Sequence, residues 1–126
     1  MKIAVSASAD NMDAMVDPRF GRCAYFIIVE TEGNDVKSSE AIENTGTQAM
    51  RGAGITAAQI VTNKGVEAVI TGNIGPNAFG VLSQSGIKIF TGVVGISVKT
   101  AVEKYLKGEL EETTVPTGPG FGRAGQ

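Results

Sequence analysis

Two stretches in the second half of the chain share one plan: an apolar strand, a Thr-Gly-x-x-Gly loop and a helix. They are VITGNIGPNAFGVL at residues 69–82 and IFTGVVGISVKTAV at residues 89–102. A strand, a helix and a second strand in this order predict parallel strands with a crossover connection. The two loops are therefore expected at the carboxyl ends of parallel strands, at the edge where open α/β sheets bind ligands.

The first half of the chain predicts strands that are joined differently. Residues 2–7 and 24–31 are short apolar runs typical of buried strands, and residues 36–43 can return as the second arm of a hairpin. Apolar residues at helical spacing from about residue 50 predict a further helix, which Gly65 ends. The expected fold is therefore α/β, with a mixed sheet of about five strands covered by helices. One domain is predicted over residues 1–110, followed by a Gly/Pro-rich, flexible tail at residues 111–126.

The composition excludes several classes of protein. The 126 residues carry a net charge of −2 and no histidine. No basic surplus is available to bind a nucleic acid backbone, and Ser-His or Cys-His nucleophile pairs are impossible. The apolar runs are shorter than the roughly 18 residues of a membrane span. We therefore expect a cytoplasmic protein without nucleic-acid or membrane partners.

The single cysteine lies in the segment DPRFGRC, residues 17–23, next to Arg22 and close to Arg19. Two placements of Cys23 are open. If it faces the loop edge, the neighbouring positive charges lower the pKa of its thiol, and the thiolate could ligate a metal. If it faces the core, it packs as a small hydrophobic residue.

The glycine-rich loops are the second candidate for a ligand site. Each Thr-Gly-x-x-Gly loop ends at a helix N-terminus, where unpaired backbone N–H groups favour anions. The segment RGAG at residues 51–54 enters the first helix in the same way and adds a cation. Tight turns and close helix–sheet packing would explain the same glycines. Neither loop has the Gly-Lys-Ser/Thr sequence of a nucleotide triphosphate site.

Three segments together resemble a known family. They are DPRFGRCAYFIIVE, GAGITAAQIVTNKGVEAVITGNIG and GIKIFTG. In this order they are similar to the dinitrogenase iron–molybdenum cofactor biosynthesis family, which includes NifX and the C-terminal domain of NifB. The resemblance implies a three-layer α/β/α, ribonuclease H-like fold in which one strand of the sheet is antiparallel. It also implies a non-catalytic protein that binds or carries an anionic iron–sulfur or iron–molybdenum cluster, or a precursor of one, transiently.

The resemblance also indicates which residues form the site, because the family's Phe-Gly loop and Gly-rich strand ends have counterparts here. The candidate cofactor-binding residues, with Arg51 added from the helix entry and Cys23 also the candidate metal ligand, are Arg19, Phe20, Gly21, Arg22, Cys23, Arg51, Gly72, Asn73, Gly75, Gly92 and Gly95. Nitrogenase-associated members often carry a histidine near the Phe-Gly motif, where this chain has an arginine. The expected partners are proteins that donate or accept the cluster, and the chain is expected to be a monomer or a weak homo-oligomer.

Two other functions stay open. The same N–H groups and arginines could bind a small anionic metabolite without any metal. An enzyme is disfavoured, because the chain has no histidine and no clearly spaced pair of carboxylates. A ribonuclease H-like nuclease would need an acidic residue on its first strand for its metal ions, and KIAVSA at residues 2–7 has none.

Overall fold

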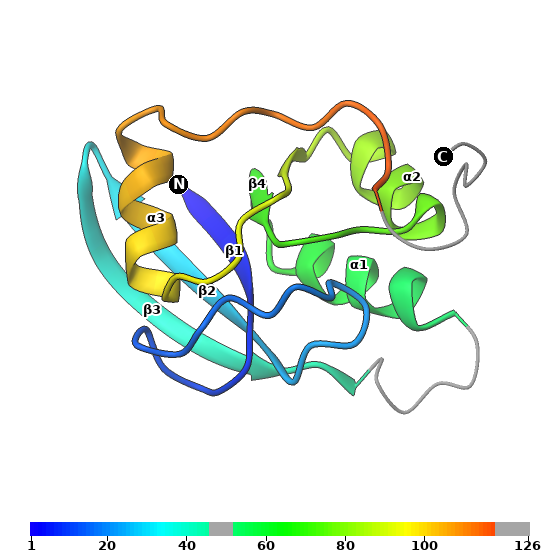
Figure 1. The fold of residues 1–126 in the computed structure, drawn as a ribbon, viewed down its shortest axis with the longest axis horizontal. Helices are drawn as coiled ribbons and strands as arrows, with labels where there is room; N and C mark the ends of the chain where they lie inside the picture. Colours follow the sequence, from blue (N-terminus) through cyan, green and yellow to red (C-terminus); the bar gives the residue numbers. More distant parts are fainter. Residues whose placement is uncertain (46–51, 118–126) are drawn as a thin grey trace.

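The computed structural model describes residues 1–45 and 52–117, and these form a five-stranded sheet between two layers of helices (Figure 1). The strands are β1 (Lys2–Ala7), β2 (Tyr25–Glu32), β3 (Asp35–Glu43), β4 (Ala68–Ile70) and β5 (Lys88–Phe90). Their order across the sheet is β3-β2-β1-β4-β5. β2 runs antiparallel to β1 and β3, whereas β1, β4 and β5 are parallel. The predicted mixed sheet, with one antiparallel strand, is confirmed.

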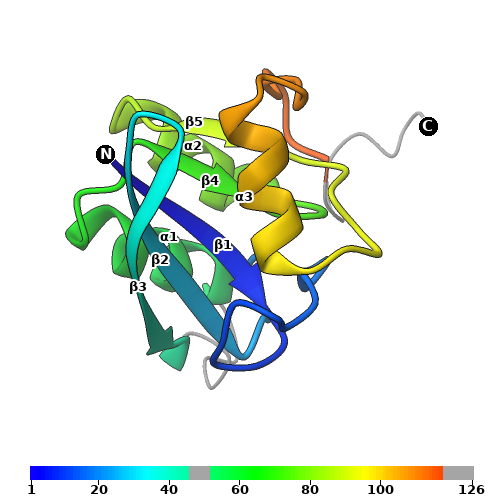
Figure 2. The ribbon, with the colours of Figure 1, turned by 90° about the vertical axis from the view of Figure 1, so that its left-hand side faces the viewer.

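Three helices cover the two faces of the sheet. They are α1 (Ala53–Asn63), α2 (Pro76–Gln84) and α3 (Val98–Leu106). α1 and α2 pack on one face and α3 packs alone on the other (Figures 1 and 2). None of the helices in the described ranges is long and apolar enough to cross a lipid bilayer.

The central strand β1 shows why both faces are covered. Its side chains alternate between the two faces, as the pleat of a strand requires. Ile3 and Val5 belong to the core under α3, whereas Ala4 belongs to the core under α1 and α2. All three are fully buried, so the middle of the strand is apolar on both faces.

The two edges of the sheet differ. β3 forms one edge and most of its residues are exposed. β5 forms the other edge and is partly covered by residues 111–117, which we call the C-terminal strap. Within the strap, Glu112 forms a β-bridge with Phe90, and the Thr113 N–H donates to the Ile89 oxygen at 2.7 Å.

The C-terminal strap crosses from the α3 side to the α2 side of the molecule (orange in Figure 1). At its end, the Thr117 N–H donates to the Ile74 oxygen at 2.9 Å. Residues 111–117 belong to the predicted Gly/Pro-rich tail, and in the structure they are hydrogen-bonded to β5 and to the loop after β4. The rest of the predicted tail, residues 118–126, lies outside the described residues.

Candidate anion-binding hollow

The loop after β4 is paired with the arginine loop, residues 17–23. The Asn73 N–H donates to the Pro18 oxygen at 2.7 Å, and the Phe20 N–H donates to the Asn73 oxygen at 3.2 Å. Gly72 approaches so closely that a Cβ there would lie 2.6 Å from the Pro18 Cα. A glycine is therefore needed where the two loops meet.

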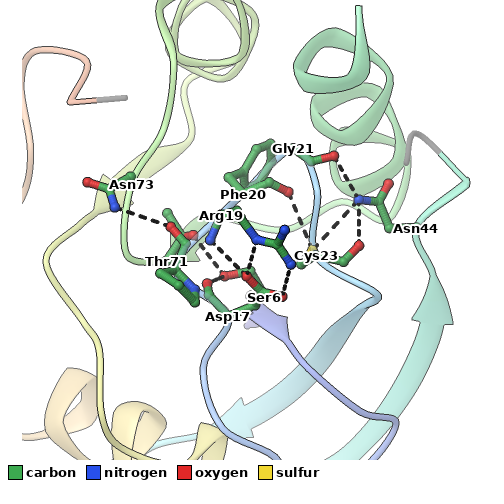
Figure 3. Close-up of polar contacts among 10 residues, drawn as sticks. Ser6, Asp17, Arg19, Phe20, Gly21, Cys23, Asn44, Thr71 and Asn73 are labelled. Carbon is green, nitrogen blue, oxygen red and sulfur yellow. Dashed lines mark hydrogen bonds and ion pairs between the residues drawn. The ribbon is translucent and has the colours of Figure 1, made fainter. Parts of the chain in front are cut away.

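Buried polar groups hold the arginine loop against the carboxyl ends of β1 and β4. The Ser6 hydroxyl lies 2.7 Å from the Asp17 carbonyl oxygen and 2.8 Å from Thr71 Oγ1 (Figure 3). The Asp17 carboxylate accepts from the Arg19 backbone N–H at 2.9 Å and from Arg19 Nε at 3.2 Å. Ser6, Asp17 and Thr71 are buried, and because their polar groups are hydrogen-bonded there, they fix the position of the loop.

Asp17 also determines what Arg19 can contribute. Its carboxylate raises the pKa of the Arg19 guanidinium, first by hydrogen bonding and then by its charge. The Arg19 side chain is still 65% exposed. Asp17 partly compensates the charge of Arg19. The main role of Arg19 is therefore to stabilise the loop, and its contribution to binding a ligand is smaller than that of an unpaired charge.

Two adjoining hollows open beside the arginine loop. They share Gly21, Arg22 and Gly75. The wider one, of about 590 Å³, continues along the first turns of α1 and α2 from Gly52 to Gly54 and from Pro76 to Ala78. The narrower one, of about 310 Å³, is lined in addition by Arg19, Phe20, Asn73 and Ile74. Most of the candidate residues near the first Thr-Gly loop, residues 71–75, thus line one continuous surface.

The wider hollow lies against two helix N-termini. α1 begins after Gly52 and α2 begins after Gly75, and neither N-cap residue supplies a side-chain hydrogen bond to its helix. Neither helix has an acidic residue in its first turn. The first-turn N–H groups, which no N-cap side chain in the described residues satisfies, and the positive end of each helix dipole therefore act in the same space.

Small residues allow the two helix ends to come together. A Cβ on Gly21 would lie 3.2 Å from the Gly54 nitrogen, and one on Gly54 would lie 3.3 Å from the Ala78 Cβ. Larger side chains at Gly21 or Gly54 would push the arginine loop and the two helices apart. The glycines of this region thus serve close packing, which was the alternative that the sequence left open for them.

The second Thr-Gly loop, residues 91–95, takes a different position. Gly92 and Gly95 line neither hollow. Gly92 supports the backbone of the first loop, because its N–H donates to the Gly72 oxygen at 2.8 Å. The helix that follows, α3, is capped by Ser97, whose Oγ accepts from the Thr100 N–H at 3.2 Å.

Cys23 takes the core placement. Its exposed fraction is 0%, and it belongs to the core under α1 and α2 together with Phe20 and Phe26. Burial, followed by the negative charge of Asp17, raises the pKa of the thiol to about 12. The flanking arginines were expected to lower this pKa if the thiol faced the loop edge. The side chain points the other way, so this placement does not favour Cys23 as the predicted metal ligand.

One residue that the sequence did not single out holds this turn. The Asn44 side-chain amide donates to the carbonyl oxygens of Gly21 and Cys23 at 3.2 and 2.9 Å (Figure 3). Its position after the last hairpin strand gives no local signal of this role. The candidate Arg51 lies outside the described residues.

The donor set of the hollow is suited to an anion. Within residues 1–45 and 52–117, no group of three or more His, Cys, Asp or Glu side chains is placed to hold a metal ion. The hollow instead presents Arg22 and the first turns of two helices. These groups can bind the negatively charged surface of a ligand by charge and hydrogen bonds.

The chain is similar to known proteins over most of its length. A family model described as dinitrogenase iron-molybdenum cofactor matches residues 1–108. An uncharacterised protein of Methanocaldococcus jannaschii is 39% identical over 112 residues, which are 89% of this chain and 91% of that protein.

Solved structures with a similar fold also cover most of the chain. The apo form of the orange protein from Desulfovibrio gigas has a TM-score of 0.88 and 36% identity, covering 93% of this chain and 96% of that one. The NMR structure of a Thermotoga protein described as NifB has a TM-score of 0.79 and 35% identity, covering 94% of this chain and 98% of that one.

Proposed function

Because the chain belongs to the dinitrogenase iron–molybdenum cofactor family, we propose that it is a non-catalytic protein that binds and carries an anionic iron–sulfur or iron–molybdenum cluster or a precursor of one. The cluster is cargo in this proposal. One relative was solved as an apo form, a term used for a protein without its bound group, and this supports a binding role. The observation that carries the proposal is that Arg22 and two helix N-termini, whose N-cap residues in the described part of the chain are glycines, meet at one hollow.

The chemistry of such a cargo fits these donors. A metal–sulfur cluster exposes sulfide and carries negative charge, so it needs hydrogen-bond donors and cations when it leaves water. Arg22 supplies a cation, and the first turns of α1 and α2 supply backbone N–H groups. The volume of about 590 Å³ lies within the range of small-ligand sites.

The proposal does not require a covalent bond to the protein. Cys23 lies in the core and its thiol pKa is raised to about 12, so the thiol stays protonated near neutral pH. A cluster held by charge and hydrogen bonds alone can leave without breaking a metal–thiolate bond. Exchange of this kind suits a carrier that takes cargo from a donor protein and passes it to an acceptor protein.

The experiment is anaerobic incubation of the protein with iron and sulfide, followed by desalting and an absorption spectrum. The wild-type protein should retain a visible chromophore. Arg22→Glu should weaken its retention about tenfold, because one charge-assisted contact is replaced by repulsion. Lys99→Glu is the matched control: it makes the same charge change on the exposed surface of α3, on the opposite face of the sheet, and should retain the chromophore.

Three outcomes separate the alternatives. A wild-type protein without any chromophore would contradict the cluster proposal. Thermal protection by inorganic phosphate, with no uptake of iron and sulfide, would favour a site for a small anionic metabolite. Loss of the chromophore in Cys23→Ala, with the fold intact, would show that the buried thiol is an iron ligand after all.

A further inference from the structure

The C-terminal strap ends, in the described part of the chain, at the loop that lines the hollow. Thr117 bonds both backbone polar groups of Ile74: the Thr117 N–H donates to the Ile74 oxygen at 2.9 Å, and Thr117 Oγ1 accepts from the Ile74 N–H at 3.2 Å. Ile74 is 1% exposed and lies between Asn73 and Gly75, which line the narrower hollow with it. Thr117 therefore contacts the backbone of this loop at the residue between Asn73 and Gly75.

The strap has a second anchor with the same chemistry in another place. The Thr113 N–H donates to the Ile89 oxygen at 2.7 Å, and Thr113 Oγ1 accepts from the Thr91 N–H at 3.0 Å. This anchor lies on β5 and at the start of the second Thr-Gly loop, and none of its residues lines either hollow. Thr113 Oγ1 also bonds the Thr91 hydroxyl at 2.7 Å. Both threonines hold the backbone through their N–H and their Oγ1, but of the two only Thr117 bonds the loop of the candidate site.

We propose that Thr117 is a positioning residue, which holds residues 73–75 in the conformation that lines the hollow and leads into α2. The loop is flanked by Gly72 and Gly75, so its own sequence restricts its backbone little. The arginine loop fixes one side of it through Asn73, and Thr117 fixes the other side through Ile74. Without the Thr117 hydroxyl, the Ile74 N–H loses its partner in a nearly buried place, and the loop moves to find another.

The consequence for binding rests on the proposed function. A site that is already shaped binds its cargo more tightly, because less free energy is lost in ordering it. By the same coupling, cargo in the hollow should strengthen the contact between Thr117 and Ile74. A segment far along the sequence from the arginine loop would therefore influence how firmly the cargo is held.

The experiment compares Thr117→Val, which removes the hydroxyl at nearly constant shape, with Thr117→Ser, which retains it. Thr113→Val is the matched control. Amide hydrogen exchange is measured by NMR on the protein without cargo, and retention of the iron–sulfide chromophore is measured after anaerobic incubation. Thr117→Val should speed exchange of the Ile74 and Asn73 amides about fivefold, as expected for one hydrogen bond, and weaken retention by a similar factor. Thr117→Ser should restore both values, and Thr113→Val should change neither.

Each other outcome decides against a particular statement. If Thr117→Val exchanges and binds like the wild type, the positioning role is wrong. If Thr113→Val has the same effects as Thr117→Val, the strap only stabilises the fold, and the positioning role is again wrong. If the wild-type protein takes up no chromophore, the proposed function fails. The exchange rates at Asn73 and Ile74 in the two valine variants then still decide whether Thr117 positions the loop.

Discussion

The two Thr-Gly-x-x-Gly loops have the same sequence plan but different surroundings. Each follows a short parallel strand and leads into a helix of nine residues. The first loop, at residues 71–75, is paired with the arginine loop and leads to a helix without a side-chain cap. The second, at residues 91–95, leads to a helix capped by Ser97 on the opposite face of the sheet.

This difference shows that the motif determines the path of the backbone, whereas the neighbours determine what the loop can do. In the first loop, Gly72 is needed because another backbone lies against it. In the second loop, Gly92 and Gly95 have φ values of +80° and +76°, and a Cβ added at either would meet nothing within 4 Å. They are needed for backbone conformation alone.

Among the single substitutions that test this comparison, the largest effect is expected from alanine at the two equivalent glycines. In Gly72→Ala, the new Cβ would meet the Pro18 Cα at 2.6 Å and the Pro18 oxygen at 2.9 Å. Because both are backbone atoms, the loops have to separate, at a cost of about 3 kcal/mol in the free energy of unfolding. Gly92→Ala adds only left-handed backbone strain, of about 1 kcal/mol. Urea unfolding of both variants measures the difference.

A third alanine variant controls for the effect of a methyl group. Gly80 lies inside α2, and a Cβ there meets nothing within 4 Å. Gly80→Ala should raise the free energy of unfolding by up to about 1 kcal/mol, because alanine favours the helix. Equal costs for Gly72→Ala and Gly92→Ala would contradict the proposed distinction between close packing and backbone conformation.

The packing behind the two loops can be compared through two titrating groups. Cys23 lies behind the first loop, with its thiol pKa raised from 9.0 to about 12, mainly by burial. Tyr105 lies under α3, in edge-to-face contact with Phe90 at the end of the strand that precedes the second loop, and partial burial followed by Glu67 raises its pKa. Both groups are neutral acids that the fold keeps protonated. Their contribution to stability is therefore complete below the unfolded pKa and is lost as the pH rises toward the folded pKa.

For Cys23, this predicts that the free energy of unfolding falls by about 1.4 kcal/mol per pH unit between about pH 9 and pH 12. The measurement is a series of urea titrations for the wild type and for Cys23→Ala, because the difference between them removes the contribution of other groups. Tyr105→Phe should change the slope less, since Tyr105 is only partly buried. A Cys23→Ala protein with the wild-type slope would show that the thiol is not held in the core.

Much of the fold could be predicted because it depends on patterns within single elements. The apolar runs of β1 and β2 indicated buried strands, and the plan at residues 89–102 indicated the helix that covers one face. The repeated strand–loop–helix plan indicated the parallel half of the sheet. The assignment to the ribonuclease H-like class stays a prediction, since strand order and direction do not by themselves determine it.

The site was only partly predictable, because its geometry depends on contacts between distant segments. Arg22 and Gly75 were singled out and line the same surface. The direction of the Cys23 side chain could not be inferred from its two charged neighbours, because the turn held by Asn44 rotates it into the core. The anchoring of the strap was also missed. Thr117 bonds a residue 43 positions away in the sequence, whereas local composition indicated a flexible segment.

The smallest effect concerns the side-chain cap at the helix that follows each loop: Ser97 caps α3, whereas Gly75 supplies no cap to α2. Ser97→Ala removes the side chain that accepts from the Thr100 N–H and should lower the free energy of unfolding by about 1 kcal/mol. Gly75 has φ −80° and ψ 171°, an extended backbone that serine adopts readily. Gly75→Ser should therefore place a cap on α2 and raise the free energy of unfolding by a few tenths of a kcal/mol.

The same pair of variants should have opposite effects on function. In Gly75→Ser the new hydroxyl would occupy an N–H group that we assign to the cargo, so chromophore retention should fall although the protein becomes more stable. Ser97→Ala should retain the chromophore although it is less stable, because α3 lies on the other face. If a helix N-terminus without a side-chain cap binds the anion, adding a cap should raise stability and lower binding. If Gly75→Ser gains stability and retains the chromophore fully, the N-terminus of α2 is not part of the binding site.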